Sequence, residues 1–81
     1  MESGKPKEYH IIVNARPKTV TEDELSFEQV IKLAYDQPPT GPDVIFTVVY
    51  EKGKREGTLV PGQKVKIENG MSFRVKFTNK S

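Results

Sequence analysis

The sequence has no cysteine among its 81 residues. This absence excludes disulfides, thiolate metal sites and a cysteine nucleophile. The only histidine, His10, has no partner near it in sequence that would complete a catalytic triad or a metal site. The glycines are scattered and form neither a P-loop nor a GxGxxG motif. We therefore expect neither an enzyme nor a protein with a bound metal or cofactor.

Long apolar runs are also missing. No stretch is long enough to cross a bilayer, and the opening MESGKPKEYH lacks the apolar core of a secretory signal. The net charge is only +2, with acids at TEDEL and bases at KGKR, a pattern typical of solvated loops. We therefore expect one cytoplasmic domain that contacts no membrane, and this charge does not require a nucleic-acid partner.

The first part of the chain predicts a hairpin. Residues 1–7 show no periodicity and are expected to form a flexible leader. EYHIIVN then alternates between two faces as a strand does, NARP is typical of a turn, and KTVT predicts a short returning strand. Ala15 stands where glycine would adopt positive φ more easily, so we expect a longer or bulged turn instead of a two-residue turn.

One amphipathic helix is indicated by LSFEQVIKLAY. Ser26 can cap it, Gln29 can complete a capping box, and Leu25 can pack onto Val30 from outside the cap. The nearby acids of TEDEL suit the positive end of a helix dipole better than acid–base catalysis. Pro38 ends the helix, because its ring and its missing N–H do not fit a helix interior. One face of the helix is apolar, so it should lie on a sheet.

The second half of the chain predicts strands. VIFTVVYEK is rich in β-branched and aromatic residues and is apolar on both faces, as in a central strand. We expect KGKREG to form an exposed turn, TLVPGQ to contain a type II turn, and KVKI to form a short strand. ENG should turn the chain into the last strand, where Met71, Phe73, Val75 and Phe77 alternate with polar residues.

This order of elements predicts an α+β fold of the β-grasp type. A mixed sheet of about four or five strands would carry the helix across its concave face. The last strand would pair in parallel with the first, because the helix crossover returns the chain in that direction. We expect the folded domain at residues 8–78 and a C-terminal tail at residues 79–81. An antiparallel barrel is the competing arrangement, but it gives the capped helix no place.

Strand alternation separates an inner face, toward the helix, from an outer face. The inner set is Ile11, Val13, Phe46, Val48, Phe73 and Val75. The outer set, which we expect to dock a protein partner, is Ile12, Ile45, Thr47, Val49, Arg74 and Lys76. That face is apolar in the middle with a basic edge, and exposed apolar patches often mark protein interfaces. The alternative is that the leader or a loop simply covers Ile45 and Val49.

Base stacking in an RNA-binding sheet is a weaker interpretation of the aromatic residues. Tyr9, Phe73 and Phe77 alternate in phase with the core residues and out of phase with the basic ones. We therefore expect them to be core residues.

Three stretches, SFEQVIKLAYDQPPTGPDVIFTVVY, EGTLVPGQKVKIENGMSFRV and the closing TNKS, carry a resemblance to the bacterial multiubiquitin domain family. The resemblance spans about residues 9–81 and implies a ubiquitin-like β-grasp fold. It also implies a ubiquitin-like modifier or repeat unit from bacterial ubiquitination-like operons. Such operons encode activating-enzyme-like, conjugating-enzyme-like and metalloprotease-like proteins, and some are linked to anti-phage defence.

In this interpretation the chain is a substrate of enzymes. Its terminal carboxylate would be adenylated and then passed, as a thioester or oxyester, to a nucleophile of a target protein. The conjugation and processing region would be Thr78, Asn79, Lys80 and Ser81. Ubiquitin itself ends in two glycines, which fit a narrow channel because they have no side chains, and this region has none. The second hypothesis is therefore a non-covalent ubiquitin-like interaction domain, alone or as one unit of a tandem array.

Overall fold

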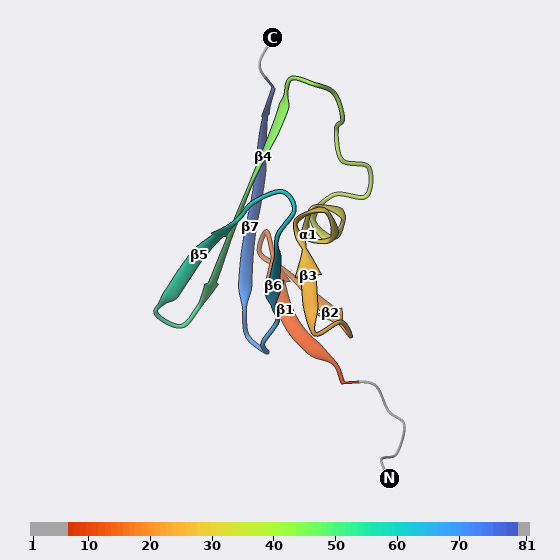
Figure 1. Ribbon diagram of the computed structural model, residues 1–81. Helices are drawn as coiled ribbons and strands as arrows, with labels where there is room; N and C mark the ends of the chain where they lie inside the picture. Colours follow the sequence, from red (N-terminus) through yellow and green to blue (C-terminus); the bar gives the residue numbers. More distant parts are fainter. Residues whose placement is uncertain (1–6, 80–81) are drawn as a thin grey trace.

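The computed structural model describes residues 7–79. Within this range seven strands and one helix follow one another along the chain (Figure 1). The elements are β1 (Tyr9–Val13), β2 (Arg16–Val20), β3 (Glu24–Ser26), α1 (Phe27–Ala34), β4 (Val44–Lys52), β5 (Arg55–Leu59), β6 (Lys64–Lys66) and β7 (Ser72–Asn79).

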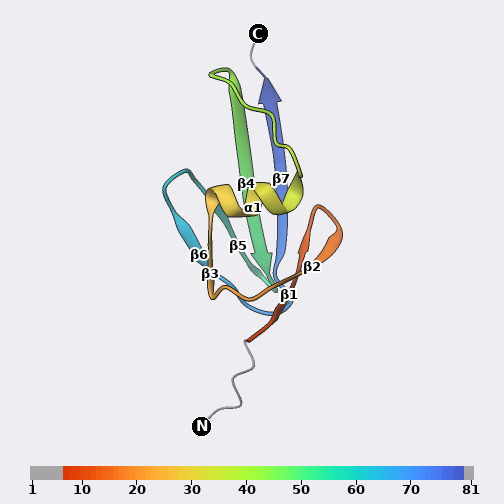
Figure 2. The same cartoon turned by 90° about the vertical axis from the view of Figure 1, so that its right-hand side faces the viewer.

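Five of these strands form a mixed sheet in the order β2-β1-β7-β4-β5. β7 pairs in parallel with β1, with Ile12 opposite Ser72, and the other neighbouring strands are antiparallel. This parallel pairing requires a long connection between the two strands, and the segment from β2 to β6, which includes α1, provides it. α1 lies across one face of the sheet, where it contacts β1, β4 and β7 (Figure 2). The predicted β-grasp arrangement is therefore confirmed.

A second, two-stranded sheet was not predicted. KVKI does form a strand, β6, but its partner is β3, with Leu25 opposite Val65. The N–H of Ile67 donates to the carbonyl of Asp23 at 2.8 Å and extends this pairing. The residues just before the helix therefore form a strand as well as a cap, and Leu25 is buried from that strand.

Helix α1 begins with the predicted capping box. The Ser26 hydroxyl accepts the N–H of Gln29 at 3.2 Å, and the Gln29 side-chain oxygen accepts the N–H of Ser26 at 2.8 Å. The helix has eight residues, and those it buries are Phe27, Val30 and Ile31. In the part of the chain that the structure describes, no helix combines the length and apolar character needed to span a membrane.

The hydrophobic core lies between α1, the small sheet and the inner face of the large sheet. The predicted inner set is confirmed: five of its six residues are at most 3% exposed, and Phe46 is partly buried. Burying one such side chain stabilises a fold by about 1.5–3 kcal/mol. The buried residues are Ile11, Val13, Val20, Leu25, Phe27, Val30, Ile31, Val48, Leu59, Ile67, Met71, Phe73 and Val75.

The predicted longer or bulged turn between β1 and β2 is wrong. It is a two-residue turn with positive φ at both positions, 51° at Asn14 and 68° at Ala15. This conformation matches the twist of hairpin strands, although the left-handed region costs an alanine about 1–2 kcal/mol. Asparagine tolerates that region well, and here its side chain is also held by β7.

Asn14 continues the pairing between β1 and β7 with its side chain. Its Nδ2 donates to the carbonyl oxygen of Val75 at 3.0 Å, and its Oδ1 accepts the N–H of Val75 at 2.8 Å. The amide thereby takes the place of the next strand residue, which the turn has diverted. The Tyr35 hydroxyl also donates to the Val75 carbonyl, at 3.1 Å. The hairpin turn, the end of α1 and β7 therefore meet at one residue.

A second asparagine extends the same ladder at its other end. Asn69 Oδ1 accepts the N–H of His10 at 2.7 Å, and the His10 carbonyl accepts the N–H of Gly70 at 2.8 Å. Gly70 has φ 88°, a conformation that favours glycine. The turn that starts β7 is therefore tied directly to β1.

Two further sequence expectations are wrong. KGKREG is not all turn, because Arg55 to Gly57 belong to β5 and pair with β4. Phe77 is not a core residue, since it is 41% exposed. The end of β7 extends beyond the short helix, as Figures 1 and 2 show. There Tyr35 and Phe46 pack beside Phe77, with ring centroids 5.7 and 5.8 Å from its own.

Replacing Asn14 with glycine should lower the free energy of unfolding by about 1–3 kcal/mol. Glycine keeps the positive φ but leaves the N–H and carbonyl of Val75 without their amide partner. The matched control is Ala15→Gly, which should raise the free energy of unfolding because it removes the strain of a Cβ at positive φ. Urea denaturation measures both changes, and equal losses in the two variants would contradict this role of Asn14.

The Tyr9 hydroxyl at the start of β1 donates to Asp23 Oδ1 at 2.7 Å. This hydrogen bond, with desolvation and the charge of Asp23 as smaller causes, raises the pKa of Tyr9 above its usual 10.0. Because the folded state has the higher pKa, the bond contributes fully below pH of about 10. Its contribution is lost as the pH rises through the folded-state pKa.

Asp23→Ala should therefore lower the pKa of Tyr9 toward 10.0. The titration of the Tyr9 ring Cζ resonance, followed by NMR in both proteins, measures the difference. An unchanged midpoint in the variant would show that Asp23 is not the cause.

Candidate protein-binding surface

The outer face of the large sheet is the candidate site. Opposed residues on neighbouring strands share a face, and Val49 of β4 lies opposite Arg74 of β7. Ile12 of β1 lies on the same face, opposite Ser72. The structure thus places all six predicted docking residues there: Ile12, Ile45, Thr47, Val49, Arg74 and Lys76.

Three of these six residues gather at one place. Ile12, Val49 and Arg74 line a shallow depression of about 370 Å³. Ile12 is 42% exposed, and Val49 is partly buried. The turn residues Asn14 and Ala15 also line the depression. It can accept an apolar side chain beside a charged one.

The other three residues continue the outer face along β4 and β7, away from the depression. Ile45 is four residues from Val49 along β4, which is about 13 Å at the spacing of a strand. Ile45 is 49% exposed, so no segment within residues 7–79 buries it. Residues 1–6 of the expected leader at residues 1–7 lie outside the described residues. The predicted site is therefore a strip and not a round patch.

The predicted basic edge of this face is partly neutralised. Arg74 Nη2 lies 2.9 Å from Glu51 Oε2, and Glu56 lies opposite Glu51 on β5. Glu51 was not among the predicted docking residues, although the alternation that places Thr47 and Val49 on the outer face places Glu51 there too. The paired side chains are 67% and 42% exposed, so the pair contributes only about 0–1 kcal/mol to stability. Its main effect is on the charge that a partner meets.

The predicted conjugation region is described only in part. Thr78 and Asn79 are exposed and belong to β7, where they lie opposite Ile45 and Val44 of β4. They are therefore held in an extended conformation. Lys80 and Ser81 lie outside the described residues.

The remaining titratable groups do not assemble into a site. His10 lies on β1, with its Nδ1 3.4 Å from the Thr19 hydroxyl. Among residues 7–79 no three histidine, aspartate or glutamate side chains are placed to hold a metal ion.

A comparison with protein-family models matches residues 9–79 to the family described as multiubiquitin. The chain belongs to the multiubiquitin family. The match spans all the elements of the multiubiquitin domain, from β1 to the end of β7, and agrees with its ubiquitin-like β-grasp fold. Comparisons of this multiubiquitin domain with curated proteins and with solved structures gave no significant match.

Proposed function

We propose that this multiubiquitin domain is a ubiquitin-like protein modifier of a bacterial ubiquitination-like pathway. In the proposed reaction an activating-enzyme-like protein joins the modifier's carboxylate to AMP from ATP, with release of pyrophosphate. An enzyme thiolate displaces the AMP to give a thioester. A nucleophile of a target protein then displaces the thiol with the help of a conjugating-enzyme-like protein. A metalloprotease-like deconjugase would trim the precursor or hydrolyse the finished bond.

The observation that carries this proposal is the course of β7. This strand has eight residues and ends far from the start of β1, at the opposite end of the sheet (Figures 1 and 2). Its backbone is extended up to Asn79, and its last three residues are exposed. An extended, exposed strand end is the form in which a carboxylate can enter a narrow enzyme channel.

The pairing of β7 with β4 affects which residue can present the reactive carboxylate. Asn79 still lies opposite Val44 of β4. A carboxylate at Thr78 or Asn79 therefore requires the end of β7 to separate from β4. Strand ends open locally at low free-energy cost. We propose that processing exposes the carboxylate within this region or just beyond it.

The outer face supports the proposed partners. The strip runs from the depression at Ile12 and Val49 to Ile45, which lies opposite Thr78 near the end of β7. An enzyme docked along the strip would hold the strand end at a defined position. We propose that the activating-enzyme-like protein binds this strip. The operon context implied by the family resemblance would place such a modifier in the cytoplasm and in anti-phage defence.

The second candidate function is a non-covalent ubiquitin-like interaction domain, alone or in a tandem array. It is favoured by the opposite positions of the start of β1 and the end of β7, which would let units follow one another without covering the outer face. RNA binding has less support, because Phe73 is buried on the inner face and Arg74 is paired with Glu51.

Incubation with ATP and the enzymes encoded beside the gene should yield a covalent adduct. Its intact mass should equal the sum of modifier and target minus one water, and reactions without ATP should yield none. The modifier should be supplied both with its native end and as forms trimmed within residues 78–81. No adduct from any of these forms would contradict the modifier function and favour the non-covalent one.

Ile45→Asp combined with Arg74→Glu should slow thioester formation at least about tenfold, because both changes lie on the proposed docking strip. Lys32→Glu on the exposed side of α1 is the matched charge-reversal control and should leave the rate unchanged. Circular dichroism checks that both variants stay folded. Unchanged activation of a folded double variant would remove the docking assignment while leaving the modifier function standing.

A further inference from the structure

Strand β5 forms an open edge of the large sheet. It pairs with β4 on one side, with Tyr50 opposite Gly57, and it is the last strand in the sheet order. Across residues 7–79 no other strand pairs with its second side. Such an edge presents unpaired backbone donors and acceptors.

The register tells which backbone groups face this open side. The carbonyl of Phe73 points toward the hairpin, where it accepts the N–H of Asn14, the residue directly after β1. Ser72 and Arg74, on either side of Phe73, therefore turn their backbone groups toward β4. Alternation across β4 then turns Gly57 and Leu59 toward β4, and Glu56 and Thr58 toward the open side. The N–H and carbonyl groups of Glu56 and Thr58 are therefore available to an added strand.

A groove of about 390 Å³ runs beside this edge on the inner face. Its floor includes Tyr50, Val65 and Met71. Gly57 shapes it, because a Cβ at that position would come within 2.5 Å of the Tyr50 ring. The ring therefore lies over the Gly57 backbone, where another residue would place its side chain. The result is an apolar floor directly next to unpaired backbone groups.

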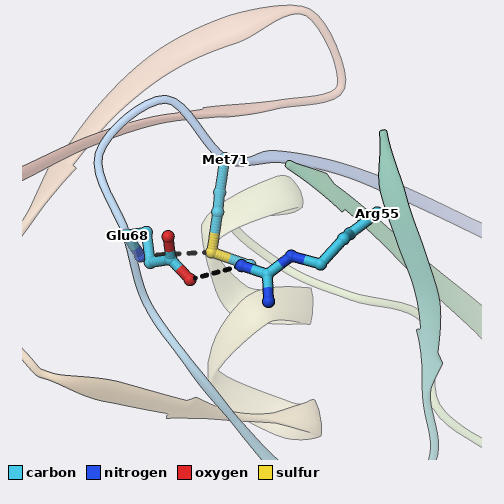
Figure 3. Close-up of polar contacts among 3 residues, drawn as sticks. All are labelled: Arg55, Glu68 and Met71. Carbon is cyan, nitrogen blue, oxygen red and sulfur yellow. Dashed lines mark hydrogen bonds and ion pairs between the residues drawn. The ribbon is translucent and has the colours of Figure 1, made fainter. Parts of the chain in front are cut away.

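Contacts within the chain hold one wall of the groove in place. Figure 3 shows Arg55 reaching from β5 toward the turn before β7, where its Nη2 lies 3.1 Å from Glu68 Oε2. The Glu68 N–H in turn donates to the Sδ of Met71 at 3.2 Å. The groove is thus built from residues that are already in contact with one another.

The charge on the groove side is positive. Lys52 lines the groove and makes no ion pair with any residue of the described range. Glu68 is already paired with Arg55, and Lys66 lies opposite Glu24 on β3. Glu56 also lines the groove, although strand alternation directs its side chain to the outer face, opposite Glu51. Within residues 7–79, Lys52 and Lys66 are therefore the groove lysines without an ion pair, and Lys52 is the one on the strand next to β5.

We propose that the open edge of β5 binds an extended peptide segment of a partner protein, which adds to the sheet as a sixth strand. One apolar side chain of the segment enters the groove over Tyr50 and Met71. An acidic side chain on the same face of the segment meets Lys52. Its other face carries neutral polar residues, because an acid beside Glu56 would be repelled. In this mode of binding, backbone pairing supplies affinity and the groove supplies specificity.

This site lies on a different edge of the sheet from the proposed docking strip. It uses neither the six predicted docking residues nor the end of β7. The proposal therefore does not depend on whether the domain is conjugated to other proteins.

The probe is an acetylated, amidated peptide of sequence TVTITET, in which Val, Ile and Glu alternate with Thr. Titrated into the ¹⁵N-labelled protein, it should shift the amide resonances of Glu56 to Val60 and of Lys52. Hydrogen exchange at the N–H groups of Glu56 and Thr58 should slow by about tenfold or more on binding. The N–H groups of Gly57 and Leu59, which face β4, should be protected with and without peptide.

Two matched controls separate strand addition from simple side-chain contact. Thr58→Pro removes an outward-facing N–H without removing a hydrogen bond to β4. It should raise the Kd of the peptide about tenfold, a loss of about 1.4 kcal/mol of binding free energy. Thr58→Val keeps that N–H and should bind as the native protein does. The same peptide N-methylated at its three central residues keeps its charge and side chains but loses the ability to pair, so it should not bind.

The proposal is overturned if about 1 mM peptide produces no shifts, or if the N-methylated peptide binds equally well. Shifts centred on Ile12 and Val49 would also overturn it, because they would move the binding to the outer face. Protection of Glu56 and Thr58 that rises with protein concentration alone would assign the edge to a second copy of the chain instead.

Discussion

The parallel contact between the first and last strands is the constraint on which the rest of the structure depends. β1 and β7 lie at opposite ends of the sequence, and their pairing joins the β1–β2 hairpin to the β7–β4–β5 part of the sheet. The paired stretch is short, with Ile12 and Val13 as its register positions. Asparagine side chains lengthen it at both ends, Asn69 through His10 and Asn14 through Val75. Without this ladder the two parts of the sheet have no common core.

The candidate docking surface also depends on the pairing of β1 with β7. Its depression combines Ile12 of the hairpin with Val49 of β4 and Arg74 of β7, so it exists only when the two parts are joined. The edge of β5 depends on it less, because that edge and its groove belong to β4, β5, β6 and the turn before β7. The short helix adds a third feature. Since α1 has eight residues, the start of β4 and the end of β7 extend past it, and Phe77 keeps 41% of its surface exposed.

Features that depend on neighbouring residues could be predicted from the sequence. The capping box joins Ser26 to Gln29, three positions away, and the alternation of β4 and β7 sorts inner from outer residues without any knowledge of their partners. The β-grasp topology could be predicted from the element order, because a helix and several strands separate the first strand from the last, and parallel strands need such a long connection. The six outer-face positions could be predicted from the same strand alternation. The resemblance to the multiubiquitin family agrees with the family match.

The features that could not be predicted depend on distant contacts. The turn at Asn14 is held by Val75, 61 residues away, so Ala15 alone suggested a looser turn. The exposure of Phe77 depends on how far β7 extends beyond the helix, which strand periodicity cannot tell. β3 has only three residues, too few for an alternating pattern, and its pairing with the predicted strand β6 joins residues as distant as Leu25 and Val65. The partial neutralisation of Arg74 depends on the strand register, which brings Glu51 of β4 next to it.

The parallel ladder also has a mechanical consequence. The start of β1 and the end of β7 lie at opposite ends of the sheet, and the two strands run in the same direction (Figure 1). Tension applied between these two points slides one strand along the other. All the hydrogen bonds of the ladder, including those of the two asparagine side chains, then share the force at once and cannot open one after another. A protein that unfolds such a domain by pulling between the start of β1 and the end of β7 therefore has to break these hydrogen bonds together.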